Sequence, residues 1–87
     1  MNEVIVIGRL IKNIEYKFII NGKKNALASF FIELENKSVV ECRGYDLVAD
    51  YCYRRLNENL VVIIHGKLRN KEYYFIEIES FEKIDME

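Results

Sequence analysis

The first strand expected from the sequence is apolar on both faces, and no other feature constrains the fold as strongly. Residues 4–10 read VIVIGRL, so the two valines point to one side of the strand and the two isoleucines to the other. A strand with one face in water alternates apolar with polar residues instead. Gly8 allows a sharp bend or a close approach of the backbone. Such a strand suits a small closed barrel, or a strand that meets a second subunit.

The length and charge of the chain limit what it can do. Its 87 residues fit a single domain spanning 1–87, and a domain of this size buries only about 60% of its unfolded surface. The net charge is −1, so there is no overall positive field, and binding to an anion needs local clustering of the 13 Lys and Arg residues. We expect a protein without catalytic residues.

The cysteines and the single histidine give no metal-ligand pattern. Cys42 and Cys52 lack a CxxC spacing, and His65 is the only histidine, so we expect no metal and no cofactor. Two buried, reduced thiols are consistent with the cytoplasm. We find no signal-peptide pattern and no run long enough to span a membrane, and we therefore expect no membrane partner.

Alternation and turn residues predict a mostly β chain with one helix. The pair Asn21-Gly22 is typical of a type I′ hairpin turn, and spacings of three and four after Asp46 indicate a short amphipathic helix with Asp46 as its N-cap. Apolar residues at alternate positions from Ala26 to Leu34 indicate the core face of a strand. The extended segments are expected at 3–12, 14–20, 27–35, 39–45, 60–69 and 73–81.

Four of these extended segments precede the predicted helix and two follow it, and we interpret the order as three strands, one helix and two strands. The predicted fold class is therefore all-β with one short helix: a five-stranded Greek-key OB-fold barrel with its helix between strands 3 and 4.

Several segments resemble the bacterial and phage single-stranded DNA-binding proteins, in the order in which that family has them. Residues 2–10 (NEVIVIGRL) resemble its opening strand, which ends in Gly-(Arg/Asn)-Leu, and residues 15–22 (EYKFIING) are similar to its Glu-x-Arg-Tyr-x-x-Asn-Gly segment. Residues 26–30 (ALASF) are similar to its Ala-Val-Ala-x-(Phe/Ile) strand, and residues 61–68 (VVIIHGKL) resemble its Val-x-(Val/Ile)-x-Gly-x-Leu strand. The resemblance implies non-catalytic, largely sequence-independent binding of single-stranded DNA in replication, recombination or repair.

The chain also departs from the family. Lys37 and Arg43 stand where the family has aromatic residues, whereas Tyr73 matches a third family aromatic, and Arg69 and Lys71 match basic positions that lead to it. The loops after the second strand and between the last two strands are shorter. The acidic tail with which the family recruits replication proteins has no counterpart before Glu87.

Binding single-stranded DNA requires cations for its phosphates and exposed aromatic rings for its bases. Basic and aromatic residues interleave in this way on the predicted strands, diluted by glutamates that favour weak binding. The candidate nucleic-acid-binding residues are Lys12, Lys17, Phe31, Lys37, Arg43, Lys67, Arg69, Lys71, Tyr73 and Phe75.

The resemblance also implies a homo-oligomer, a dimer or tetramer, that associates through the first strand. The expected interface residues are Val4, Val6, Gly8 and Leu10. Two other interpretations stay open: an OB-fold protein-interaction or primosome-like module with weak nucleic-acid binding, and an RNA-binding barrel of the cold-shock type.

Overall fold

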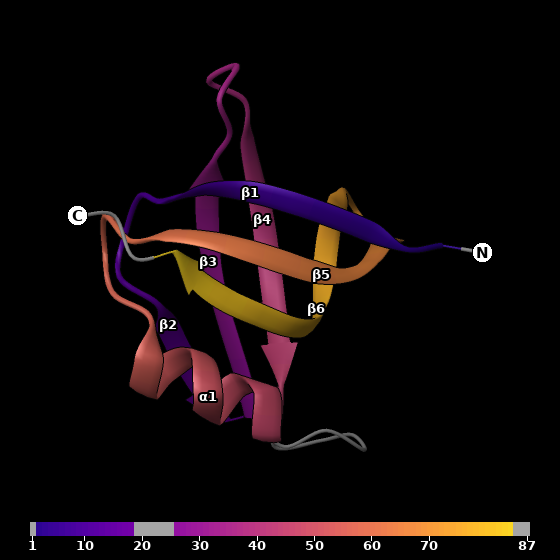
Figure 1. The fold of residues 1–87 in the computed structure, drawn as a ribbon. Helices are drawn as coiled ribbons and strands as arrows, with labels where there is room; N and C mark the ends of the chain where they lie inside the picture. Colours follow the sequence, from indigo (N-terminus) through magenta and orange to yellow (C-terminus); the bar gives the residue numbers. More distant parts are fainter. Residues whose placement is uncertain (1, 19–25, 85–87) are drawn as a thin grey trace.

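A computed structural model describes residues 2–18 and 26–84, which form six strands and one helix (Figure 1). The Asn21-Gly22 turn lies outside the described residues. Among the described residues, no helix has the length and apolar character needed to cross a membrane. The elements are β1 (Val4–Leu10), β2 (Glu15–Phe18), β3 (Ala26–Glu33), β4 (Val39–Tyr45), α1 (Leu47–Arg55), β5 (Val61–Asn70) and β6 (Tyr74–Ile84).

The strands close into a barrel in the order β1-β5-β6-β4-β3-β2, because β1 also pairs with β3. Leu10 at the end of β1 lies opposite Ile32, and Glu15 at the start of β2 lies opposite Ser29. β1 and β2 therefore follow each other along the same neighbour and act as one interrupted barrel strand. Counted in this way the barrel has five strands with α1 between the third and the fourth, and the predicted OB-fold is confirmed.

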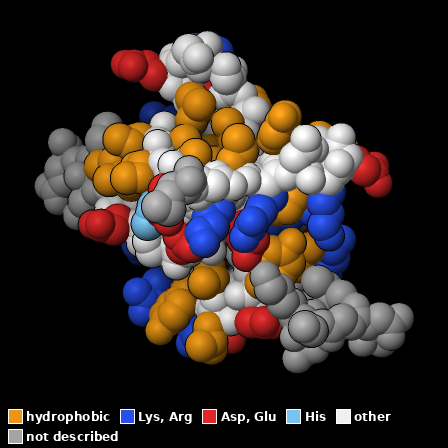
Figure 2. Space-filling model, turned by 90° about the vertical axis from the view of Figure 1, so that its right-hand side faces the viewer, with side chains coloured by type: hydrophobic (Ala, Val, Ile, Leu, Met, Phe, Trp, Pro, Cys, Tyr) orange, Lys and Arg blue, Asp and Glu red, His pale blue; other side chains and the backbone are white. Residues whose placement is uncertain are grey.

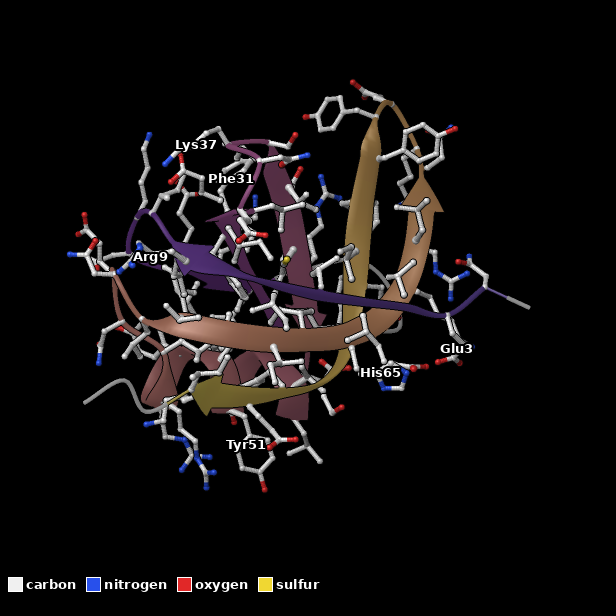
Figure 3. All side chains as sticks on the ribbon, turned by 45° about the horizontal axis from the view of Figure 1, so that its top comes forward. Glu3, Arg9, Phe31, Lys37, Tyr51 and His65 are labelled. Carbon is white, nitrogen blue, oxygen red and sulfur yellow. The ribbon has the colours of Figure 1, made fainter. Side chains whose placement is uncertain are left out.

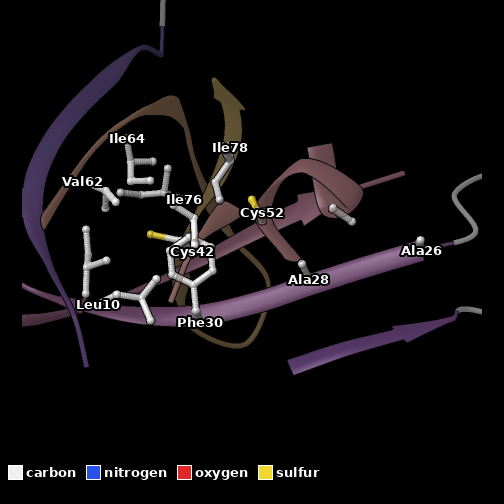
Figure 4. Close-up of a cluster of buried hydrophobic side chains, with 13 residues drawn as sticks. Leu10, Ala26, Ala28, Phe30, Cys42, Cys52, Val62, Ile64, Ile76 and Ile78 are labelled. Atoms are coloured by element: carbon white, nitrogen blue, oxygen red, sulfur yellow. The ribbon is translucent and has the colours of Figure 1, made fainter. Parts of the chain in front are cut away.

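Alternating side chains of the strands fill the barrel. In β3 the side chains of Ala28, Phe30 and Ile32 are buried, as the sequence pattern predicts. They meet side chains from β1, β4, β5 and β6 in the core shown in Figure 4, where Phe30 lies close to Cys42. The helix closes one end of this core with Ala49 and Cys52.

The start of α1 differs in detail from the prediction. Asp46 occupies the N-cap position with a positive φ of 53°, but its side chain makes no capping hydrogen bond. Its carboxylate instead accepts a hydrogen bond from the Ala26 N–H at 3.2 Å. Asp46 therefore ties the helix start to β3. Arg54 and Arg55 lie in the last turn, where the helix dipole favours cations.

The predicted oligomer-interface residues lie on the core side of β1, and their part in an interface stays a prediction. Leu10 is fully buried and Val4 and Val6 pack against the core. Gly8 is buried because the Glu33 carbonyl lies so close that an added Cβ would stand 2.7 Å from its oxygen. The exposed side chains of β1 are those of Ile5, Ile7 and Arg9. Since both faces of this strand are apolar, alternation alone did not identify the inner one.

Candidate nucleic-acid interface

The outer face of the barrel carries most of the predicted binding residues, because strand registers place them in adjacent rows. Arg43 of β4 lies opposite Ser29 of β3 and beside Glu77 of β6, which in turn lies opposite Lys67 of β5. Each of these strands turns the partnered side chains to the same side of the sheet. Arg43 and Lys67 therefore belong to one row of this face.

Arg43 is the central cation of this face. Its guanidinium forms an ion pair with Glu41 at 2.7 Å and lies over the ring of Phe75, 4.0 Å from the ring centroid. The hydrogen bond to Glu41 is the main cause that raises the pKa of Arg43 above its ordinary value. The stack and the ion pair hold the guanidinium plane in a fixed orientation.

Phe75 is not an open stacking surface, contrary to the prediction. Its side chain is 2% exposed and lies beneath Arg43. The exposed rings at this position are Tyr73 and Tyr74, which are 61% and 64% exposed. Sequence reasoning missed Tyr74. The signal that could have identified Tyr74 is its position at the start of β6, directly after the turn that follows β5, where side chains are commonly exposed.

The tip of the β5–β6 hairpin brings three predicted residues together. Arg43, Lys71 and Tyr73 line a hollow of about 100 Å³ together with Glu72. Lys71 and Tyr73 come from the turn that joins β5 to β6, and Arg43 comes from the neighbouring β4. Two cations and one exposed ring, which suit a phosphate and its base, thus share one site with the carboxylate residue Glu72, and one of the cations, Arg43, is already paired with Glu41.

Two predicted cations on β5 already have carboxylate partners. Arg69 pairs with Glu77 at 2.9 Å, and Lys67 lies 3.7 Å from Glu79. Figure 2 shows this alternation of blue and red side chains across the face. A phosphate has to displace a carboxylate to reach either cation, which lowers the net gain of each contact.

The remaining predicted residues lie along the β2–β3–β4 side of the face. Phe31 is 41% exposed in β3, and Lys37 lies in the following turn with a φ of 73°; Figure 3 shows both toward the same end of that hairpin. The Ile11 N–H donates to the Phe31 carbonyl, which brings exposed Lys12 near β3. Lys17, five positions after Lys12, lies opposite Leu27 of β3. Among the described residues, Lys12, Lys17, Lys37 and Lys71 take part in no ion pair.

Solved structures share this architecture, although no protein-family model and no curated protein matches the chain by sequence. The wild-type single-stranded DNA binding protein from Thermus aquaticus superposes with a TM-score of 0.88 at 18% identity, over 100% of this chain and 42% of that one. The chain thus spans less than half the length of that protein. The SSB domain of a Synechococcus protein gives 0.85 at 15% identity, over 93% of both chains.

PriB from Ralstonia solanacearum is similar as well, with a TM-score of 0.78 at 15% identity over 97% of this chain and 99% of that one. At these identities the likeness concerns the fold: an OB-fold barrel of the kind found in single-stranded DNA binding proteins and in PriB.

Proposed function

We propose that this protein binds single-stranded DNA without catalysis and with little sequence preference. The observation that carries the proposal is the hollow at the hairpin tip, where the exposed Tyr73 ring stands beside Arg43 and Lys71. A base stacks on the ring and the adjoining phosphates contact the two cations. Every base has a face that can stack, so such a site reads no sequence.

The energetics favour weak binding with a steep salt dependence. Stacking contributes about 1–3 kcal/mol per base, and the exposed rings of Tyr73 and Phe31 are available for it, with the exposed ring of Tyr74 next to Tyr73 in the chain. The cations of β5 are held by Glu77 and Glu79, so their contribution at low salt is reduced. The single-stranded DNA is therefore contacted mainly by residues that extend from the tip of the β5–β6 hairpin toward Phe31 and Lys37.

The likeness to proteins named as single-stranded DNA binding proteins supports this function and a role in replication, recombination or repair. The free cysteines support a cytoplasmic location. We further propose a homo-oligomer that associates through β1. In the described residues, β1 pairs with β5 from Val4 to Arg9 but with β3 only at Arg9 and Leu10, which leaves one edge of its first half open.

Fluorescence anisotropy with labelled oligo-dT and a matched duplex tests the function. We expect preferential binding of oligo-dT that falls steeply between low and moderate salt. Tyr73→Ala and Lys71→Ala weaken it, whereas Tyr51→Ala, which removes an exposed ring on α1, leaves it unchanged. Equal affinity for duplex, or a loss of the same size in Tyr51→Ala and Tyr73→Ala, contradicts the proposal.

A second candidate is an OB-fold module that binds protein and has only residual affinity for nucleic acid. The observation in its favour is that Arg43, Lys67 and Arg69 each lie in an ion pair with a neighbouring glutamate. The likeness to PriB is compatible with either candidate. Absence of oligo-dT binding at low salt, together with a stable assembly, favours this second function.

A further inference from the structure

A histidine and two glutamates from three separate segments meet at one end of β5. Glu3 precedes β1, His65 lies in β5 and Glu79 lies in β6. One ligand atom from each of them lies within 4.8 Å of those of the other two. Figure 3 shows Glu3 and His65 side by side, and in Figure 2 the pale blue histidine borders red carboxylates.

A β-bulge lies beside Glu79. In the β5–β6 ladder, His65 pairs with Ser80 and Gly66 pairs with Ile78, so Glu79 is the extra residue between them. Its side chain points outward, like that of Glu77 two positions earlier, and the bulge leaves it next to His65 with no residue opposite. Gly66 makes the bulge feasible, because a Cβ at this position would collide with the Glu77 carbonyl oxygen.

Strand pairing positions the third residue. Ile5 of β1 lies opposite His65, and Glu3, two positions earlier, points to the same face. The His65 Nε2 lies 2.6 Å from the Glu3 Oε1, so the imidazole nitrogen already faces the carboxylate. All three side chains are partly open to solvent, so an ion reaches them without any rearrangement of the barrel.

The chemistry of these three groups selects among ions. Imidazole and carboxylate together suit zinc and other first-row transition metals, whereas calcium and magnesium prefer sites made of oxygen alone. Three protein ligands leave the fourth tetrahedral position of zinc to water. Lys67 opposes the ion, because its ammonium lies 3.7 Å from Glu79 and competes for that carboxylate.

We infer that Glu3, His65 and Glu79 form a surface site for one divalent transition-metal ion such as zinc. The site joins the residue before β1 to β5 and β6. Its ligands are not residues of the hairpin-tip hollow, but Glu79 is also the ion-pair partner of Lys67 on the proposed DNA-binding face.

Calorimetric titration of the untagged full chain with zinc chloride tests the inference. We expect one ion per chain in the wild type. His65→Gln and Glu79→Gln weaken binding by about tenfold or more, since even outer-shell partners of a metal are worth that much. Lys67→Ala tightens it. Glu58→Gln, at an exposed glutamate in the loop after α1, serves as the matched control and leaves it unchanged.

The single histidine gives a second, direct readout. In an NMR spectrum the imidazole signals belong to His65 alone, and zinc at one equivalent shifts them if the ring is a ligand. Absence of zinc binding, or binding of equal strength in the wild type and in His65→Gln with unmoved imidazole signals, overturns the inference. Since exposed side chains are exchanged, circular dichroism is expected to show the same fold in every variant.

Discussion

At the scale of single residues, the contact between Arg43 and Phe75 links stability to the proposed binding site. The guanidinium covers a ring that would otherwise meet water, and Glu41 holds it there. Arg43→Lys keeps the charge but loses the planar stack, so we expect a free energy of unfolding lower by about 1 kcal/mol. Urea denaturation measures the free energy of unfolding. Lys67→Arg, the reverse exchange of cations on the same face, is the control. A variant as stable as the wild type contradicts this role of the stack.

The two cysteines predict how stability changes at alkaline pH. Burial raises the pKa of the Cys42 and Cys52 thiols to about 12, above an ordinary value of 9.0. Above the ordinary value the unfolded chain loses these protons while the folded chain keeps them. The folded state is therefore fully favoured below pH 9 and loses this contribution as the pH rises toward about 12.

A variant with both cysteines replaced by alanine isolates this effect. Its free energy of unfolding is lower at neutral pH because two core side chains are truncated, but it falls less steeply between pH 9 and pH 11. Each thiol accounts for at most about 1.4 kcal/mol per pH unit of the difference in slope. All other ionisable groups are the same in both proteins and cancel in the comparison. If the free energy of unfolding has the same slope against pH in the wild type and in the variant, the thiols are not buried and neutral in the folded state.

At the scale of elements, the carboxylates of β6 restrain the cations of β5. Glu77→Gln frees Arg69 for a phosphate, so we expect tighter oligo-dT binding at low salt. One additional phosphate contact steepens the slope of log K against log salt by about 0.7. Glu82→Gln, farther along β6, changes the net charge equally and is the control. The idea fails if the two variants have the same slope.

The local sequence pattern was sufficient to predict most helices and strands of this fold. It was insufficient where the burial of a side chain depends on a residue of another element. Alternation in β3 identified Phe30 and Ile32 as core, and the change of period after Asp46 identified α1. Burial of Phe75 was not predictable, because it depends on Arg43 of a strand distant in the chain. The phase of β1 was ambiguous because both of its faces are apolar.

The sequence predicted which residues form the candidate site better than it predicted how they are arranged in space. Arg43, Lys71 and Tyr73 were expected from the sequence and do line one hollow. Their distance from one another depends on the parallel pairing of β4 with β6, which no local pattern indicates. The cluster around His65 was not expected, because Glu3, His65 and Glu79 lie far apart in the sequence and only the pairing of β1 with β5 and of β5 with β6 brings them together.

At the scale of the whole molecule, β1 presents its isoleucines outward beside an open strand edge. Ile5 is 68% exposed and Ile7 is 54% exposed, which is unusual for side chains of this kind. If the chain associates through β1, a charge on this face disrupts the assembly. We expect Ile7→Asp to lower the sedimentation coefficient, whereas Leu47→Asp, at an exposed apolar residue of α1, does not. A wild-type protein that sediments as a monomer at high concentration contradicts the proposed oligomer.

The central claim is that unpaired DNA lies across the hairpin tips on the outer face of the barrel. A titration of isotope-labelled protein with oligo-dT, followed through its backbone amide NMR signals, tests that claim most directly. The account predicts the largest shifts at Arg43, at Lys71 to Tyr73 and around Phe31, with little change along α1. Shifts concentrated on α1, or none at low salt, would contradict it.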